Sequence, residues 1–285
     1  MKHIILLALI SLITLTPNAY GEIELRAKQM RTTDGLPSNS IRNIYQDSKG
    51  FLWLGTLNGL SRYDGNSFLN FQPEINANGR ISLIDNRINK VIEDQNGFLW
   101  IGPELYSCYD LQKSRFVDFT GSGEYEQNYA YSLFASNGDI WLYHRTNGAR
   151  HIITKSDRTM TSVEFKTERG NLPDNRVQFI EEDEAGRIWI GTMRGLAFIS
   201  KGDFNIIDRK NNFIASITHE RDMFFLTDDG YVYWYNTTSG KLSKSAELPA
   251  GNIRSNCKFA FKNQWIIFTS TGCLLYTSDA ADERS

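Results

Sequence analysis

Side chains suited to ligand recognition recur at matching positions of this chain. Asparagine stands at the same point of three similar segments, and arginine follows it in two of them. Departures from the shared pattern add glutamate, tyrosine, histidine and further arginine. Flat aromatic rings combined with planar hydrogen-bonding groups suit the recognition of sugars. The candidate ligand-binding residues are Asn39, Asn86, Arg87, Glu104, Tyr106, His144, Arg145, Asn175, Arg176 and Arg194.

Each of these features also has a purely structural interpretation. The asparagines could satisfy backbone N–H groups where the chain turns a corner, since Asn side chains commonly do so. Drift within a repeat explains the departures about as well as selection for a ligand does. Both interpretations stay open at the level of the sequence.

Catalytic chemistry finds no comparable support. The chain has no H-E-x-x-H metal motif, no G-x-S-x-G nucleophile motif and no phosphate-binding Gly-Lys-Ser loop. Asp47, Asp94 and Asp183 recur at one position, but each is interpreted as capping its own hairpin turn through its carboxylate. The sequence therefore predicts no catalytic residues, no metal site and no cofactor.

The elements that must position the candidate residues belong to an internal repeat. Its copies share an Asp-x-x-Gly turn followed by an apolar run that carries tryptophan. Trp53, Trp100, Trp141 and Trp189 are 47, 41 and 48 residues apart. Because apolar residues alternate with period two, a spacing in the forties indicates one four-stranded propeller blade rather than a helical pair.

The first repeat predicts strands over 41–46, 51–56, 60–63 and 67–71. The tryptophan of each second strand is expected to pack between neighbouring blades through its large apolar ring. Two later copies are degenerate, and Phe224 stands where one of them should carry tryptophan. The predicted fold class is all-β: a β-propeller of four-stranded blades in an incomplete ring, with five blades and part of a sixth.

Composition sets the wider limits. The 285 residues are 41% hydrophobic and 13% aromatic, which is enough apolar matter for a core and excludes wholesale disorder. The formal net charge of −2 argues against sequence-independent binding of nucleic acid, which needs a basic surface.

The two ends of the chain are expected to lie outside the folded part. Residues 1–21 have the charged, apolar and small-residue order of a signal peptide, with a retained membrane anchor as the alternative. Residues 22–272 are expected to form a partial propeller sensor domain. Residues 273–285 are interpreted as a non-native tail, because 273–283 resemble a translated sequencing adapter, with a natural acidic tail as the alternative. The mature chain is therefore expected to be a periplasmic fragment.

The repeated motifs resemble the two-component regulator propeller repeat, in copies that together cover about residues 36–272. The resemblance implies a seven-bladed ring in the intact parent. It also implies the periplasmic sensor of a bacterial hybrid histidine kinase that controls gene expression in response to glycan breakdown products. Kinase activity is implied only for the parent, through domains that this sequence lacks, so the fragment itself is expected to be no enzyme.

The partners implied are an oligosaccharide ligand and a second copy of the intact receptor in a homodimer. No nucleic acid is expected to bind this fragment, and membrane attachment is expected only through a downstream helix. Alternatives are a secreted or periplasmic protein-interaction module and the sensor of a diguanylate cyclase. A propeller lyase or hydrolase is a weaker alternative, because it needs an acid–base pair.

Overall fold

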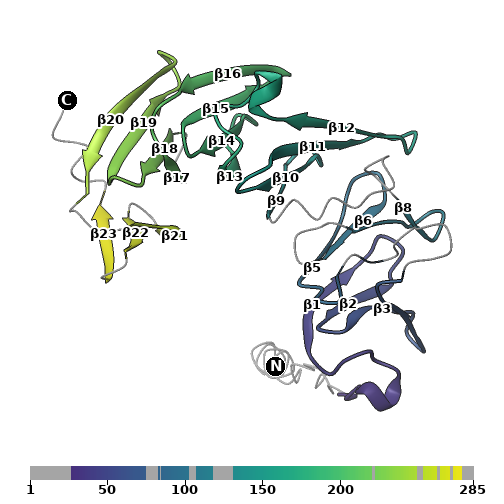
Figure 1. Ribbon diagram of the computed structural model, residues 1–285. Coiled ribbons are helices and arrows are strands. Elements are labelled where there is room, and N and C mark those ends of the chain that lie inside the picture. The colour runs from purple at the N-terminus through teal and green to yellow at the C-terminus, as the bar shows by residue number, and fades with distance from the viewer. Residues whose placement is uncertain are drawn as a thin grey trace, which may run out of the picture.

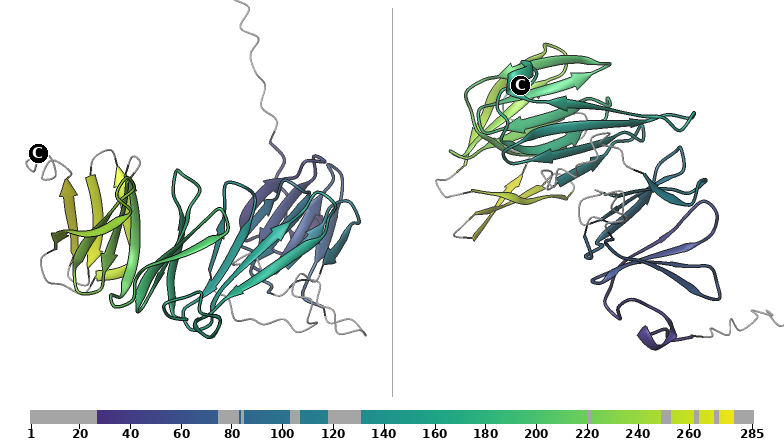
Figure 2. Two further views of the ribbon diagram at one scale, coloured as in Figure 1. Left: turned by 90° about the horizontal axis from the view of Figure 1, so that it is seen from above. Right: turned by 45° about the vertical axis from the view of Figure 1, so that its right-hand side comes forward.

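The computed structural model describes residues 27–74, 83, 85–102, 107–117, 131–219 and 222–248, together with three strands between 253 and 277. Its sheets follow one another along the chain and form an arc (Figure 1). The first strand of a sheet lies on the concave side of the arc, as β9, β13 and β17 do, and the last lies on the convex side. Neighbouring sheets stand side by side in the turned views (Figure 2). None of the helices in the described residues has the length and hydrophobicity needed to cross a membrane.

Five of the sheets have four antiparallel strands in up-and-down order, and the last has three. The first and second blades comprise β1 (Ile41–Gln46), β2 (Leu52–Thr56), β3 (Gly59–Tyr63), β4 (Phe68–Phe71), β5 (Lys90–Glu93), β6 (Phe98–Gly102), β7 (Ser107–Asp110) and β8 (Arg115–Val117). The third and fourth comprise β9 (Tyr131–Phe134), β10 (Ile140–His144), β11 (Gly148–Thr154), β12 (Met160–Phe165), β13 (Val177–Glu182), β14 (Ile188–Thr192), β15 (Gly195–Ser200) and β16 (Asp203–Asp208). The fifth comprises β17 (Phe213–His219), β18 (Asp222–Thr227), β19 (Tyr231–Asn236) and β20 (Lys241–Glu247), and the three-stranded sheet comprises β21 (Ile253–Phe261), β22 (Gln264–Thr269) and β23 (Gly272–Thr277). The prediction of five blades and part of a sixth is confirmed.

Strand β23 lies largely within the segment that the sequence interprets as a non-native tail. The origin of that tail stays a prediction. At the other end, residues 27–30 form no strand, although they stand where an outer strand precedes later copies of the repeat. A short 3-10 turn, η1 (Thr32–Asp34), follows them, and η2 (Thr167–Arg169) occupies the same place before the fourth blade.

The hairpin between the first two strands of a blade is closed by the repeated aspartate. In the first blade, Oδ1 of Asp47 accepts hydrogen bonds from the backbone N–H groups of Lys49 and Phe51, each at 2.9 Å. Gly50 completes the turn with a φ of 90°, which glycine adopts without a Cβ penalty. The carboxylates of Asp94 and Asp183 make the same pair of contacts in the second and fourth blades. The predicted capping role of these aspartates is confirmed.

The same carboxylates also hold the tryptophan of the repeat. The indole Nε1–H of Trp53 donates to Oδ2 of Asp47 at 2.7 Å. The matching distances are 3.0 Å from Trp100 to Asp94 and 2.7 Å from Trp189 to Asp183. One buried carboxylate therefore ties a hairpin to the ring beside it, which explains why Asp and Trp keep a spacing of six residues.

The core lies between blades, as the sequence predicts. Trp53 is fully buried and shares a cluster with Val91, Leu99, Ile101 and Tyr109 of the second blade. Each of the next three tryptophans likewise packs against the blade that follows it; these are Trp100, Trp141 and Trp189. Phe224 takes this place in the fifth blade, where it packs on a cluster of that blade's own apolar residues.

The blades approach each other so closely that glycine is required at their contact. A Cβ on Gly55 would lie 2.5 Å from the backbone oxygen of Ile88, which belongs to the segment that leads into the first strand of the next blade. Gly55 does not adopt a left-handed φ, so the penalty for alanine comes from this contact. We expect Gly55→Ala to destabilise the protein by about 1–3 kcal/mol, the usual cost of overpacking. Leu57→Ala, at an exposed turn residue, serves as the control in urea unfolding. If the two variants have the same free energy of unfolding, the close approach of Gly55 to the backbone of Ile88 does not limit the stability of the protein.

The first blade exposes the face that its neighbours bury. Ile44 is 63% exposed, whereas Val91 and Ile180, which also stand three residues before the repeated aspartate, are 3% and 4% exposed. Val91 and Ile180 each belong to a buried cluster that includes the tryptophan of the preceding blade. The exposed position therefore follows from the blade order and does not need a separate ligand-binding role.

Candidate ligand-binding face

The second-to-third-strand turn of one blade meets the lead-in segment of the next. The backbone N–H of Gly59 donates to the carbonyl of Asn86 at 2.7 Å, and that of Ile88 donates to the carbonyl of Thr56 at 2.8 Å. Gly148 and Asn175 are joined in the same way at 2.8 Å. We define the candidate face as the surface formed by three turns, 56–59, 143–148 and 192–195, by the segments 85–88 and 174–178, which lead into β5 and into the start of β13, and by Tyr131, which pairs with Tyr143. It brings together most of the sequence-predicted binding residues.

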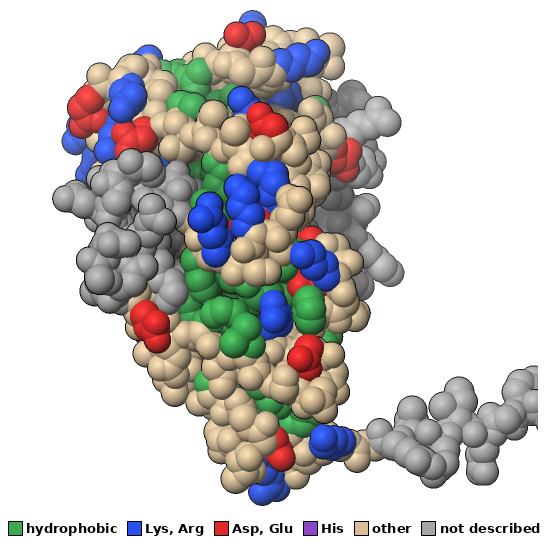
Figure 3. Space-filling model, turned by 90° about the vertical axis from the view of Figure 1, so that its right-hand side faces the viewer, with side chains coloured by type: hydrophobic (Ala, Val, Ile, Leu, Met, Phe, Trp, Pro, Cys, Tyr) green, Lys and Arg blue, Asp and Glu red, His purple; other side chains and the backbone are tan. Residues whose placement is uncertain are grey.

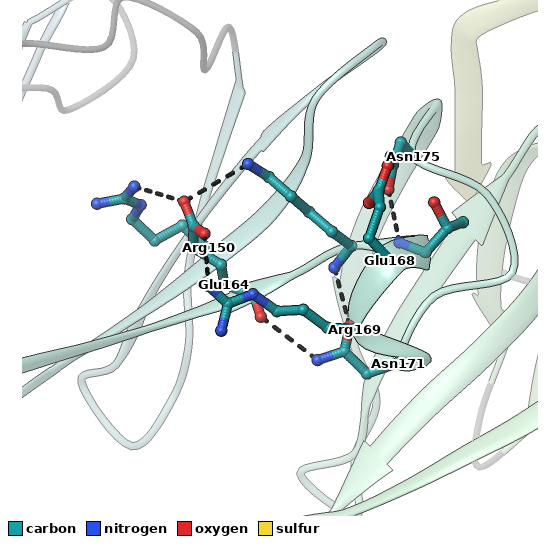
Figure 4. Close-up of polar contacts among 8 residues, drawn as sticks. Arg150, Glu164, Glu168, Arg169, Asn171 and Asn175 are labelled. Atoms are coloured by element: carbon teal, nitrogen blue, oxygen red, sulfur yellow. Dashed lines mark hydrogen bonds and ion pairs between the residues drawn. The ribbon is translucent and has the colours of Figure 1, made fainter.

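Two of the three predicted asparagines fasten corners of the chain. Oδ1 of Asn39 accepts from the backbone N–H of Thr32 at 2.9 Å, and Oδ1 of Asn175 accepts from that of Thr167 at 2.8 Å. The Nδ2 group of Asn175 donates to both carboxylate oxygens of Glu168, at 3.0 and 3.1 Å (Figure 4). Both side chains therefore satisfy backbone N–H groups where the chain turns a corner, as the structural interpretation of the asparagines expects.

The corner before the fourth blade gathers three cations around one carboxylate. The carboxylate of Glu164 on β12 forms ion pairs with Arg150 at 2.9 Å, Arg169 at 3.1 Å and Lys166 at 3.7 Å (Figure 4). Burial opposes ionisation of Glu164, but the charges of Lys166 and Arg150 outweigh it and hold the pKa of its carboxyl below the usual value. Three cations thus share one carboxylate beside Asn175.

His144 takes over a structural task in the turn of the third blade. Its Nδ1 accepts from the backbone N–H of Thr146 at 3.2 Å. In the first and fourth blades, threonine hydroxyls accept the matching N–H group: Thr56 at 3.0 Å and Thr192 at 3.4 Å. The histidine therefore replaces threonine as the acceptor that shapes this turn.

The neighbouring Arg145 lies beside the aromatic ring of Tyr131. Its guanidinium carbon is 5.5 Å from the ring centre of Tyr131, which stacks on Tyr143 at 5.2 Å with an angle of 21° between the planes. The Nη1 group of Arg145 donates to Oε1 of Gln178 at 3.5 Å, across the boundary between the third and fourth blades. All four side chains are half-buried, so they combine partly accessible ring surface with planar hydrogen-bonding groups.

Two arginines of the fourth blade gather at one carboxylate. Arg176 donates to Asp174 through Nε at 2.8 Å and Nη2 at 2.6 Å, and Nε of Arg194 lies 3.9 Å from Oδ2 of the same residue. Hydrogen bonding to Arg176 lowers the pKa of the Asp174 carboxyl and raises the pKa of Arg176. Asp174 therefore stays ionised near neutral pH and orients Arg176.

Arg87 and Asp85 form a similar pair in the second blade, with Nη2 3.1 Å from Oδ2. Asp therefore stands two residues before Arg in both lead-in segments, a signal in the sequence that would have predicted these pairs. Asp85, Asp174 and Gln178 are not among the predicted binding residues, and neither is Tyr131, which follows a stretch without a repeat match. Predicted residues Glu104 and Tyr106 lie outside the described residues.

The convex rim is a second polar surface, where basic side chains gather among exposed hydrophobic ones (Figure 3). Two cations elsewhere in the described residues hold neighbouring blades together. Arg158 of the third blade contacts Asp110 of the second and lies 4.5 Å from the ring centre of Phe98. Lys49 Nζ donates to the carbonyl of Leu111 at 2.6 Å. Arg158 and Lys49 are therefore engaged in the packing of blades against one another. The described residues contain no cluster suited to holding a metal ion.

Comparisons with known proteins agree with this architecture. The family model described as two component regulator propeller matches residues 35–58, 82–104 and 171–194. An extracellular domain from B. thetaiotaomicron, named as part of a hybrid two-component system, aligns with a TM-score of 0.50 and 18% identity over 89% of this chain and 36% of its own. Another from the same organism, named as part of a one-component system, aligns with a TM-score of 0.51 and 21% identity over 85% of this chain and 32% of its own.

At these identities the two solved structures show a shared fold alone. The chain spans about a third of the length of each of them. Among curated proteins, none matches this chain in sequence.

Proposed function

We propose that this chain, which carries two-component regulator propeller repeats, is the ligand-sensing propeller of a bacterial hybrid two-component sensor kinase. In this proposal it lies in the periplasm, binds a glycan-derived oligosaccharide on the candidate face and signals to control gene expression. The family match supports the sensor assignment, and the make-up of the candidate face supports the ligand class.

One observation carries the proposal about the ligand. The stacked rings of Tyr131 and Tyr143 lie beside Arg145 and Gln178 at a boundary between two blades. Sugars combine apolar ring faces with hydroxyl groups that both donate and accept hydrogen bonds, and this set of side chains complements both features.

The position of the site suggests how binding could be converted into a signal. Its side chains come from two blades whose backbones are joined through Gly148 and Asn175. A ligand that contacts both blades stabilises the relative position of the two blades in which it binds more tightly. It can shift the receptor between two arrangements only by the difference between its affinities for them.

The test is a thermal-shift screen of the full chain against neutral and acidic oligosaccharides. We expect one class to raise the unfolding midpoint, because a ligand at a hundred times its Kd adds about 2.7 kcal/mol of stability. Tyr131→Ala should abolish the shift, whereas Lys201→Ala, at an exposed turn of the same chain, should retain it. If no oligosaccharide changes the midpoint, the sugar-sensing function is wrong. Release of shorter products would instead indicate a glycan-degrading enzyme.

A further inference from the structure

We infer that the ligand of the candidate face carries an anionic group, a carboxylate or a sulfate, and that Arg145, Arg176 and Arg194 receive it. This inference rests on the proposed function and names the chemical class of its ligand. Its basis is the local charge and the geometry of the arginines at the boundary between the third and fourth blades.

The charge at this boundary differs from that of the chain as a whole. At the candidate-face end of this boundary six cations lie with three carboxylates, although the net charge of the entire chain is −2, and the Glu182 carboxylate that holds Ser136 lies at the other end of the strands. The cations are Arg145, Arg150, Lys166, Arg169, Arg176 and Arg194, and the carboxylates are Glu164, Glu168 and Asp174. Such a local surplus attracts an anion and raises its association rate.

The arginines differ in how far their charge is already satisfied. Asp174 is 11% exposed and engages Arg176 through two hydrogen bonds. Arg194 is 72% exposed and reaches the same carboxylate only at 3.9 Å. An incoming oxyanion would therefore find one guanidinium oriented by Asp174 and a second one largely open to solvent. Arginine favours such groups because its planar fork donates two parallel hydrogen bonds to them.

The next blade limits where the anion can lie. In the fifth blade, Asp229 stands at the turn position of Arg194, two residues after a threonine in both cases, and Asp228 precedes it. Asp228 accepts a hydrogen bond from Asn212 at 2.8 Å. Like charges repel, so the anionic group belongs at the third and fourth blades, and only hydroxyl groups of the ligand suit the fifth.

The test compares a uronate trisaccharide, its methyl ester and a sulfated disaccharide in calorimetric titrations of the full chain. We expect the uronate or the sulfated sugar to bind, and the neutral ester to bind at least about tenfold more weakly, because hydrogen bonds to charged groups are about twice as strong as neutral ones. Binding of the acid should also weaken as salt rises.

Two variants locate the effect. Arg194→Gln should weaken binding of the acidic sugar by about tenfold or more while leaving the unfolding midpoint unchanged, since the side chain is largely exposed. Lys201→Gln removes one charge at the opposite end of the same blade and should leave the affinity unchanged. If the ester binds as tightly as the acid and Arg194→Gln has no effect, the anionic class is wrong while oligosaccharide binding stands. If none of the three sugars binds while another oligosaccharide raises the unfolding midpoint, the anionic class is wrong and the proposed function stands; if no oligosaccharide does so, both proposals fail.

Discussion

Replacing Asp183 with alanine is expected to destabilise the protein by about 3–5 kcal/mol, the usual cost of breaking a buried charge network. Asp183 is 6% exposed, and its carboxylate accepts hydrogen bonds from the backbone N–H groups of Ala185 and Arg187. It also accepts from Nε of Arg187 at 2.6 Å and from Nε1 of Trp189 at 2.7 Å. Alanine leaves these donors without their acceptor in a largely buried site. Urea unfolding followed by circular dichroism measures the loss.

Asp203→Ala is the matched control for this prediction. It removes an exposed carboxylate from the same blade and should change the free energy of unfolding by less than about 0.5 kcal/mol. A loss below about 1 kcal/mol in Asp183→Ala would mean that water or a rearranged turn replaces the carboxylate at little cost. In that case the repeated Asp would not be what holds hairpin and tryptophan together.

Truncation of Trp189 should be about as costly. The side chain is fully buried and lies 4.8 Å from the ring centre of Phe225 and 4.7 Å from that of Tyr235, both in the fifth blade. We expect Trp189→Ala to cost about 3–5 kcal/mol, because the cavity opens at the contact between two blades. Trp189→Phe keeps most of the packing but leaves Asp183 without the indole donor, so it should cost less.

The control for the tryptophan is Leu69→Ala, which truncates an apolar residue that is 47% exposed. It should have a much smaller effect in the same urea titration. The losses of Asp183→Ala and Trp189→Ala should not add in the double variant, because the two side chains are hydrogen-bonded. Full additivity would contradict the coupling on which the interpretation of the repeat depends.

The sequence predicts the blades well because their determinants are local. Alternating apolar residues and the Asp-x-x-Gly turn place a first strand at 41–46, which is where β1 lies, and the other strands of that blade begin and end within one residue of their predicted bounds. The Trp–Asp hydrogen bond is missed, although both residues recur in the motif. Periodicity gives the face of a strand on which a side chain lies, but it does not say which polar atom an indole N–H will meet.

The candidate face is harder to predict because it joins residues from separate repeats. Asn175 and His144 have the residue types of a sugar site, yet their side chains support a corner and a turn. Arg145 is a candidate ligand contact because Tyr131 and Gln178 lie beside it, and those two residues belong to separate strands, β9 and β13. Residue type alone does not distinguish a polar group that faces a ligand from one that satisfies the backbone.

Hydrogen exchange of the full chain, with and without the oligosaccharide that stabilises it most, tests the central claim most directly. We predict slower exchange with ligand at 143–148, 174–178 and 192–195, where the turns and lead-in segments of neighbouring blades meet. The Asp-x-x-Gly hairpins at 47–51, 94–98 and 183–187 lie at the opposite ends of the strands and should exchange at the same rate in both states. Protection confined to those hairpins, with none on the candidate face, would contradict the account.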